Sequence, residues 1–330
     1  MRLRGRRGTQ PAYAPVDFSV RCSGNAGGRP LVTVIGIFGP TASAKSRVAE
    51  AVADRIPGEL VSADSFQVYR GLPILTNQPS SPVRMVGIWP LDREASVGDF
   101  APLAQAAIDE ILAVGRTPVV VGGTGLYLRA ALAELSLPPP PRPGARERWE
   151  RVYGELGPET AHGRLAELDP AAAAVVHPND RRRVVRALEL AEAGSSLAPG
   201  EDRLWGGETR HPTIVFGLEV PKDVIERRIE KRTREMFERG VEEEVRRALA
   251  APISSTARQA LGLDEVATLP RDEAIEAIVV RTRRYAAYQR KWMRRIPGIV
   301  MVGADRPPGE IADDIVALAC TRERVPRPRG

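Results

Sequence analysis

Eight consecutive residues have the types and spacing of a phosphate-binding loop. They follow a short apolar segment and read Gly39-Pro40-Thr41-Ala42-Ser43-Ala44-Lys45-Ser46. In such a loop the backbone N–H groups and the start of the next helix bind an anion, Lys45 adds a positive charge, and the Ser46 hydroxyl can bind a metal ion. Ala44 stands where the pattern G-x-x-x-x-G-K-[ST] has glycine, and its Cβ could crowd a phosphate or strain the backbone. The alternative is a surface turn that happens to hold a lysine.

A second group of candidate residues follows two further apolar segments. Asp64 and Ser65 come directly after one of them, and Gly122-Gly123-Thr124-Gly125 ends the other. In a doubly wound sheet such residues share the edge with the phosphate loop, so the Asp64 carboxylate can bind the metal or act as a general base. An Asp that only caps the next turn is the alternative. Thr124 can cap a helix or touch substrate, and this strand end lacks the acidic residue that typical ATPases use to hold magnesium.

Arginines gather on segments with helical spacing. Arg182, Arg183 and Arg186 lie within about one turn, and Arg228 and Arg232, four residues apart, share a helix face. Residues 281–295 interleave three aromatic residues with seven basic ones. This pattern fits contact with a phosphate backbone. The alternative is a helix whose aromatic face packs in the core while its basic face lies in solvent.

The elements that must position these residues alternate between strands and helices. Strands are predicted at 31–38, 59–63 and 117–121, and helices at 46–55, 100–115 and 125–134. Alternation of this kind indicates an α/β fold, a P-loop NTPase-like parallel sheet flanked by helices.

Five prolines within residues 137–143 interrupt this alternation and mark a boundary. Beyond it we predict a mostly helical insertion over 137–212, with a helix at 181–193 capped by Asn179-Asp180. The core, whose first part is 31–136, then resumes over 213–318, with strands at 213–218 and 299–302 and helices at 222–250, broken near Gly240, and 271–295. Residues 1–30 are predicted to be a disordered basic arm, and residues 319–330 a disordered tail.

The composition sets limits on the partner and the compartment. The chain has 330 residues, 43% of them hydrophobic, and a net charge of +6, which fits a polyanionic partner such as nucleic acid or an arginine-rich proteome. Cys22 and Cys320 are too few for a disulfide framework or a zinc site, which fits a reducing cytoplasm. No apolar run approaches a membrane span, and no secretory signal is recognisable.

Together these motifs resemble those of one family over about residues 31–302. They occur in the family's order at 39–46, 64–69, Thr76, 121–127, 177–180, 186–189 and 226–229. The chain is similar to tRNA dimethylallyltransferases, also called tRNA isopentenyltransferases. The resemblance implies a P-loop sheet domain whose helical insertion grips the anticodon stem-loop of tRNA. It also implies a Mg²⁺-dependent monomer that transfers the dimethylallyl group of dimethylallyl diphosphate to N6 of adenosine 37, in tRNAs that read codons beginning with U.

The resemblance also implies roles for individual residues. Residues 39–46 and Arg232 would bind the diphosphate, Arg228 would stabilise it, and Ser46 and Asp64 would hold Mg²⁺. Asp64 would accept a proton from the adenine amine, while Thr124 would orient the reacting groups. The residues implied to contact tRNA are Asp64, Ser65, Phe66, Gln67, Arg146, Arg182, Arg183, Val184, Val185, Arg186, Gln259 and Gly262.

Two alternatives remain beside this enzyme. The first is a small-molecule P-loop kinase or an isopentenyltransferase acting on adenine nucleotides, although a small substrate needs no arginine-bearing insertion. The second is a catalytically weakened tRNA-binding relative, suggested by departures from the family pattern at Ala44, Gln78 and Leu263.

Overall fold

The core of the fold is a five-stranded sheet in the order β2-β3-β1-β4-β5, in which all neighbouring strands are parallel. The computed structural model describes residues 34–135, 139, 142–198 and 208–321. The strands are β1 Val34–Phe38, β2 Gly58–Ser62, β3 Thr117–Gly122, β4 Thr213–Glu219 and β5 Val300–Gly303. The predicted α/β fold and all five predicted strands are confirmed, with boundaries that differ by a few residues.

The central strand β1 is buried along its whole length, as expected for a parallel strand covered on both faces. Its side chains alternate, so Ile35 and Ile37 enter one core cluster while Val34 and Phe38 enter another. Phe38 pairs with Gly122 of β3, so these two strands end at the same level, and with Gly217 of β4, which continues to Glu219. This register brings the loop after β1 beside residues 122–125.

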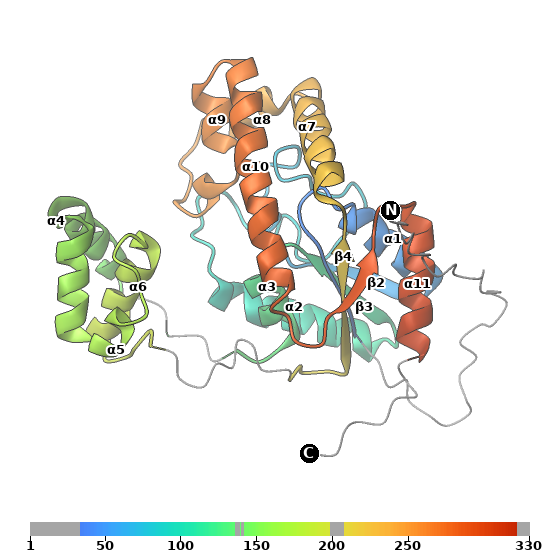
Figure 1. The fold of residues 1–330 in the computed structure, drawn as a ribbon, viewed down its shortest axis with the longest axis horizontal. Helices are drawn as coiled ribbons and strands as arrows, with labels where there is room; N and C mark the ends of the chain where they lie inside the picture. The colour runs from blue at the N-terminus through green and yellow to red at the C-terminus, as the bar shows by residue number, and fades with distance from the viewer. Residues whose placement is uncertain (1–33, 136–138, 140–141, 199–207, 322–330) are drawn as a thin grey trace, which may run out of the picture.

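Helices cover both faces of the sheet (Figure 1). One face packs against α2 and α3, and the other against α1, α7 and α11. Their bounds are α1 Lys45–Arg55, α2 Val97–Ala113, α3 Gly125–Leu132, α7 Lys222–Glu238, α10 Arg271–Met293 and α11 Pro308–Thr321. Helix α2 begins three residues earlier than predicted because Ser96 caps it, accepting a hydrogen bond from Asp99 N at 3.1 Å.

A third cluster joins the C-terminal helices to the turn formed by residues 72–78. It contains α8 Val241–Ala248, α9 Leu263–Thr268 and parts of α7 and α10, with Leu72 and Leu75 from the turn. A short 3₁₀ helix, Ala257–Gln259, precedes α9. Gly240, at φ 86°, separates α7 from α8 and confirms the predicted break.

The insertion forms a helical unit with its own core. Figure 1 shows it on the side of the molecule away from α11. It consists of α4 Ala145–Leu168, α5 Pro170–Ala173 and α6 Arg181–Glu192. Tyr153, Leu165 and Leu188 pack together inside it. The predicted cap of α6 is confirmed, since the Asp180 side chain accepts from Arg183 N at 3.2 Å.

The helical part of the chain extends further at the C-terminal end than predicted. The predicted tail from residue 319 is wrong at its start, because α11 continues to Thr321. Sequence analysis missed this helix, whose Ile311 and Ile315 are fully buried in the core cluster that also contains residues of α1. The predicted arm at 1–30 lies outside the described residues. Within the described ranges, none of the helices combines the length and apolar character needed to cross a membrane.

Candidate active site at the phosphate-binding loop

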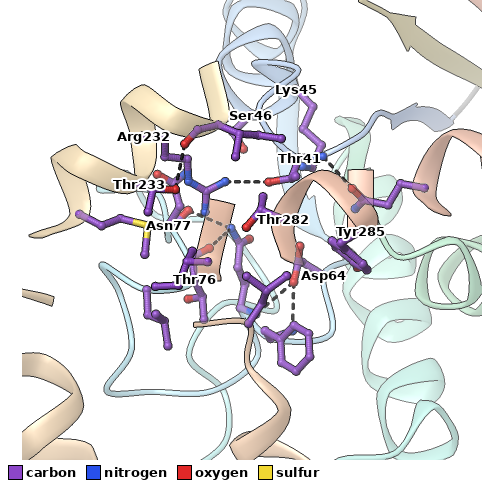
Figure 2. A pocket seen from close by; sticks show the side chains of 18 residues that line it. Thr41, Lys45, Ser46, Asp64, Thr76, Asn77, Arg232, Thr233, Thr282 and Tyr285 are labelled. Carbon is purple, nitrogen blue, oxygen red and sulfur yellow. Dashed lines mark hydrogen bonds between the residues drawn. The ribbon is translucent and has the colours of Figure 1, made fainter. Parts of the chain in front are cut away.

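A pocket opens at the carboxyl edge of the sheet, where the loop after β1 faces α7 and α10. Figure 2 shows Lys45, Ser46, Asp64 and Arg232 around the same cavity. The pocket thus brings together four residues that sequence analysis singled out, from segments up to 187 residues apart (232 minus 45). Further lining residues are Thr76, Asn77, Thr233, Thr282, Tyr285 and Gln289.

The phosphate loop folds with two alanines in left-handed conformation, Ala42 at φ 61° and Ala44 at φ 66°. Ala44 directly precedes α1, where the motif has glycine. Gly39 is required for another reason, because a Cβ there would lie 2.6 Å from Ser43 Oγ. The loop therefore adopts its turn despite the missing glycine, at a cost in backbone strain at Ala44.

Replacing Ala44 with glycine is expected to raise the free energy of unfolding by about 0.5–1 kcal/mol. Left-handed backbone costs a residue with Cβ about 1–2 kcal/mol, and the greater chain entropy of glycine offsets part of this gain. Urea denaturation measures the difference. Ala51→Gly is the control, since it lies within α1 and should lose about 1 kcal/mol instead. If both variants lose the same free energy of unfolding, Ala44 is not strained.

Two half-buried cations, Lys45 and Arg232, dominate the electrostatics of the pocket. Burial lowers the pKa of Lys45 to about 8, although the negative charge of Asp64 partly opposes this shift. Burial also lowers the pKa of Arg232, and again Asp64 opposes it. The buried Arg232 Nε has no hydrogen-bond partner among the described residues. Because buried charges are costly without partners, the pocket is suited to bind an anion.

Gln289 connects the loop to its surroundings, and sequence analysis missed it. Its Oε1 accepts from Thr41 N at 2.7 Å, and its Nε2 donates to Gly123 O at 2.8 Å. Arg232 Nη1 in turn donates to Thr41 Oγ1 at 2.8 Å. A signal was present, because Gln289 occupies the buried stripe of α10 that also contains Ala286 and Met293.

Asp64 both caps a turn and lines the pocket. Its Oδ1 accepts from Phe66 N at 3.0 Å and from Gln67 N at 3.4 Å, as the capping alternative predicted. Within the described part of the chain, no hydrogen bond uses its other carboxylate oxygen, so the cap and the ligand-facing role are compatible. Ser46 presents a hydroxyl to the same pocket.

Thr124 lies in a group of hydroxyls beside the pocket. Its Oγ1 is 3.3 Å from Ser65 Oγ and 3.4 Å from Tyr285 Oη. Burial and the negative charge of Asp64 raise the pKa of Tyr285 to about 12, which keeps its hydroxyl protonated. Thr124 occupies the N-cap position of α3, but its side chain makes no capping hydrogen bond, so that part of the prediction is wrong.

The glycines after β3 permit close packing within the protein. A Cβ on Gly122 would lie 2.3 Å from Ala63 O, and one on Gly123 would lie 2.3 Å from Gln289 Nε2. A Cβ on Gly125 would lie 2.0 Å from the ring of Trp292. These glycines are therefore needed for packing within the protein, because protein atoms already occupy the space beside them.

Arg228 does not line the pocket, although it was predicted beside Arg232. Its Nη2 lies 3.1 Å from Asp305 Oδ1, in a loop after β5. The two arginines are one helical turn apart on α7, but only Arg232 reaches the phosphate loop. The structure therefore favours Arg232 as the cation that contacts the anion.

The predicted tRNA contacts do not share one environment. Val184 and Val185 are 0% and 4% exposed in the core of the insertion, so their side chains cannot contact RNA. Arg146 and Arg186 both pair with the buried Glu189, at 2.9 Å each. Arg183 remains exposed on α6, 3.9 Å from Asp180.

Two other predicted contacts lie at a second cavity, to which the insertion contributes Arg182 and the C-terminal half contributes Gln259. This cavity adjoins the first, because Phe66, Leu261 and Tyr285 line both. Gly262, also predicted to contact tRNA, is not a lining residue of this cavity and has φ 98° directly before α9. Gln67 also lines the first cavity, but its side-chain amide is bonded to Ser62 and to the carbonyls of residues 76 and 77.

A parallel sheet with a phosphate loop after its central strand places the chain among proteins of P-loop NTPase-like fold. The sequence profile of the IPP transferase family matches residues 67–296, and the chain belongs to that family. The resemblance seen in the sequence is thereby confirmed.

Individual relatives match most of the chain. It is 38% identical over 310 residues to a tRNA dimethylallyltransferase of Thermobifida fusca (strain YX), covering 88% of this chain and 95% of that protein. A tRNA dimethylallyltransferase of Anaeromyxobacter sp. (strain K) is 39% identical over 304 residues, covering 88% and 97%.

Solved structures agree with this assignment. The tRNA isopentenylpyrophosphate transferase of Bacillus halodurans superposes with a TM-score of 0.64 and 30% identity, covering 88% of this chain and 97% of that one. A eukaryotic dimethylallyltransferase, captured acting on tRNA, gives a TM-score of 0.66 and 25% identity, covering 83% and 74%.

Proposed function

We propose that the protein is a tRNA dimethylallyltransferase, which transfers the dimethylallyl group of dimethylallyl diphosphate to N6 of adenosine 37 in tRNAs that read codons beginning with U. The observation that carries this proposal is the pocket in which the half-buried Lys45 and Arg232 face the Asp64 carboxylate. Two cations suit a diphosphate leaving group, and the carboxylate suits an amine that must lose a proton. The names of relatives across most of the chain support the same reaction.

In this proposal each residue of the pocket has a separate role in the reaction. The bond between the diphosphate oxygen and the first prenyl carbon breaks, and a bond from adenine N6 to that carbon forms. Lys45, Arg232 and the backbone N–H groups of the loop stabilise the charge that develops on the diphosphate. Asp64 accepts the proton released from N6. The hydroxyl groups of Thr124 and Tyr285 orient the reacting groups beside Asp64.

The donor set at the pocket fits Mg²⁺. Ser46 and Asp64 offer oxygen ligands, which this cation prefers, and Mg²⁺ usually keeps several waters and phosphate oxygens beside one or two protein ligands. A bound Mg²⁺ would neutralise part of the diphosphate charge.

The second cavity offers a route for the nucleobase. An adenine inside a stacked anticodon loop cannot reach a recessed carboxylate, so it must be extruded. The cavity lined by Arg182 and Gln259 adjoins the first pocket and shares Tyr285 with it, so its position suits such a base. This arrangement also argues against the small-molecule kinase and against an enzyme acting on free adenine nucleotides, because neither needs the insertion.

The direct test is incubation of the protein with Mg²⁺, dimethylallyl diphosphate and a tRNA that carries A36-A37-A38. Mass spectrometry of the digested nucleosides should detect N6-(dimethylallyl)adenosine, and a tRNA with guanosine at position 37 is the control. If only the Ala44→Gly variant forms product, the weakened-relative alternative is correct. Monomeric state and cytoplasmic location stay predictions.

The affinity for inorganic diphosphate is expected to fall about fivefold between pH 8 and pH 9, since Lys45 is half protonated near its pKa and about one-tenth protonated a unit higher. The lowered pKa of Lys45, about 8 in the free protein, sets this window. A bound anion favours the charged amine, so binding takes up a proton above pH 8. Isothermal titration measures the affinity at each pH. The Lys45→Arg variant keeps its positive charge, so its pH dependence reports only the ionisation of diphosphate itself. If the affinity falls with pH equally in wild type and in this variant, Lys45 is not the group that titrates.

A further inference from the structure

Glu244 of α8 is a buried carboxylate held by backbone amides. The side chain is among the buried charged groups, with the residue 3% exposed. Its Oε2 accepts from Ile74 N at 2.8 Å, and its Oε1 accepts from Leu75 N at 2.8 Å. A buried carboxylate is costly unless it is hydrogen-bonded, so these two hydrogen bonds stabilise Glu244 in its buried position and hold it against the backbone of residues 74 and 75.

The two amides begin a compact turn. Thr76 N donates to Leu72 O at 3.0 Å, as in one turn of an α-helix, and Gln78 N donates to Pro73 O at 2.9 Å. The first N–H groups of such a turn have no carbonyl partner within it. Glu244 supplies both missing acceptors from a helix about 170 residues later in the chain.

A second side chain fixes the other end of the turn. Gln67 Nε2 donates to Thr76 O at 3.3 Å and to Asn77 O at 2.9 Å. Its Oε1 accepts from Ser62 Oγ at 2.9 Å, which connects the turn to β2. The turn is thus held at its start by Glu244 and at its end by Gln67.

The turn forms one wall of the candidate active site. Leu75, Thr76 and Asn77 line the pocket that contains Lys45 and Arg232, and Figure 2 shows Thr76 and Asn77 facing it. We propose that Glu244 is a positioning residue for prenyl transfer, whose carboxylate fixes the turn of residues 72–78 so that Thr76 and Asn77 keep their places against the substrate. The proposal rests on the proposed function.

The test compares wild-type protein with Glu244→Gln in the prenyl-transfer assay. Glutamine keeps the shape but offers a single acceptor oxygen, so its NH₂ group faces one of the two amides. We expect kcat to fall about 10–100-fold because small displacements of a substrate wall are costly. The KM for tRNA should stay near the wild-type value, since the insertion is unchanged.

Two control variants on the same helix separate positioning from stability. Glu243→Gln changes a neighbouring exposed carboxylate that pairs with Arg246, and it should leave kcat unchanged. Val245→Ala opens a cavity in the core, so it should lower the melting temperature yet keep kcat at temperatures where it is folded. A loss of kcat in Val245→Ala equal to that in Glu244→Gln would overturn the proposal.

Hydrogen exchange gives a readout independent of activity. In Glu244→Gln the amides of Ile74 and Leu75 should exchange at least about tenfold faster, while those of β1 stay protected. Unchanged exchange, or faster exchange with wild-type kcat, overturns the positioning role. If wild-type protein forms no product, the proposed function fails, and the exchange result shows separately whether Glu244 holds the turn.

A second variant covers the case in which Glu244→Gln does not fold. Glu244→Asp keeps both acceptor oxygens but is shorter by one methylene, so exchange of the turn should increase and kcat should fall severalfold. Wild-type kcat together with increased exchange in this variant would overturn the proposal.

Discussion

Replacing Asp64 with asparagine is expected to lower kcat for prenyl transfer by about 10²–10⁴-fold, the usual contribution of a positioned general base. Asparagine keeps an oxygen that can accept from Phe66 N and Gln67 N, so the turn that Asp64 caps should persist. The amide cannot take the proton from adenine N6. Single-turnover measurements with saturating tRNA and dimethylallyl diphosphate isolate this step.

The binding of tRNA provides the internal control for this variant. Filter binding of an anticodon stem-loop should change by no more than about threefold, since Arg182 and Arg183, the exposed arginines at the start of α6, are untouched. Asp54→Asn, at an exposed position near the end of α1, is the matched neutral change and should leave kcat unaltered. Turnover that survives in the Asp64 variant would exclude this carboxylate as the base.

Replacing Arg232 with glutamine is expected to lower kcat/KM for dimethylallyl diphosphate by about 10²–10³-fold, as for loss of one preorganised charge at a leaving group. Arg232 is half-buried, lines the pocket and donates to Thr41 of the phosphate loop. Glutamine can keep a hydrogen bond to the threonine but removes the positive charge.

Arg228→Gln is the matched control, one helical turn away on the same helix. Its guanidinium pairs with Asp305 outside the pocket, so the loss in kcat/KM should stay below about threefold, the range of an exposed ion pair. A larger loss at Arg228 than at Arg232 would restore the role that the family resemblance implied for Arg228. Steady-state assays of both variants decide between the two arginines.

Local patterns were sufficient to predict the sheet and the phosphate loop. The apolar strand, the turn and the helix from Lys45 lie within about two dozen residues, and the alternation of strands and helices repeats the same signal. The boundaries of the insertion follow from the prolines near residue 140 and the return of strand character at Thr213.

Other features depend on contacts that the sequence does not specify. Helical spacing places Arg228 and Arg232 on one face, but the position of Asp305 determines which of them enters the pocket. The motif that includes Val184 and Val185 suggested RNA contact, whereas their burial shows a packing role. Glu244 has no local signature, because its partners, Ile74 and Leu75, lie in another part of the chain.

The bond between Thr41 and Gln289 also has a consequence for protein synthesis. It joins residues 248 positions apart, so the phosphate loop is made early but acquires this partner only after α10 has left the ribosome. At about 5–20 residues per second, the nascent chain waits roughly 12–50 s between the two events. During that interval the loop lacks Gln289, and for the first 191 residues of it the loop also lacks Arg232, so the anion site cannot be complete. Ligand binding is therefore expected to begin only when the second half of the sheet domain has closed over the first.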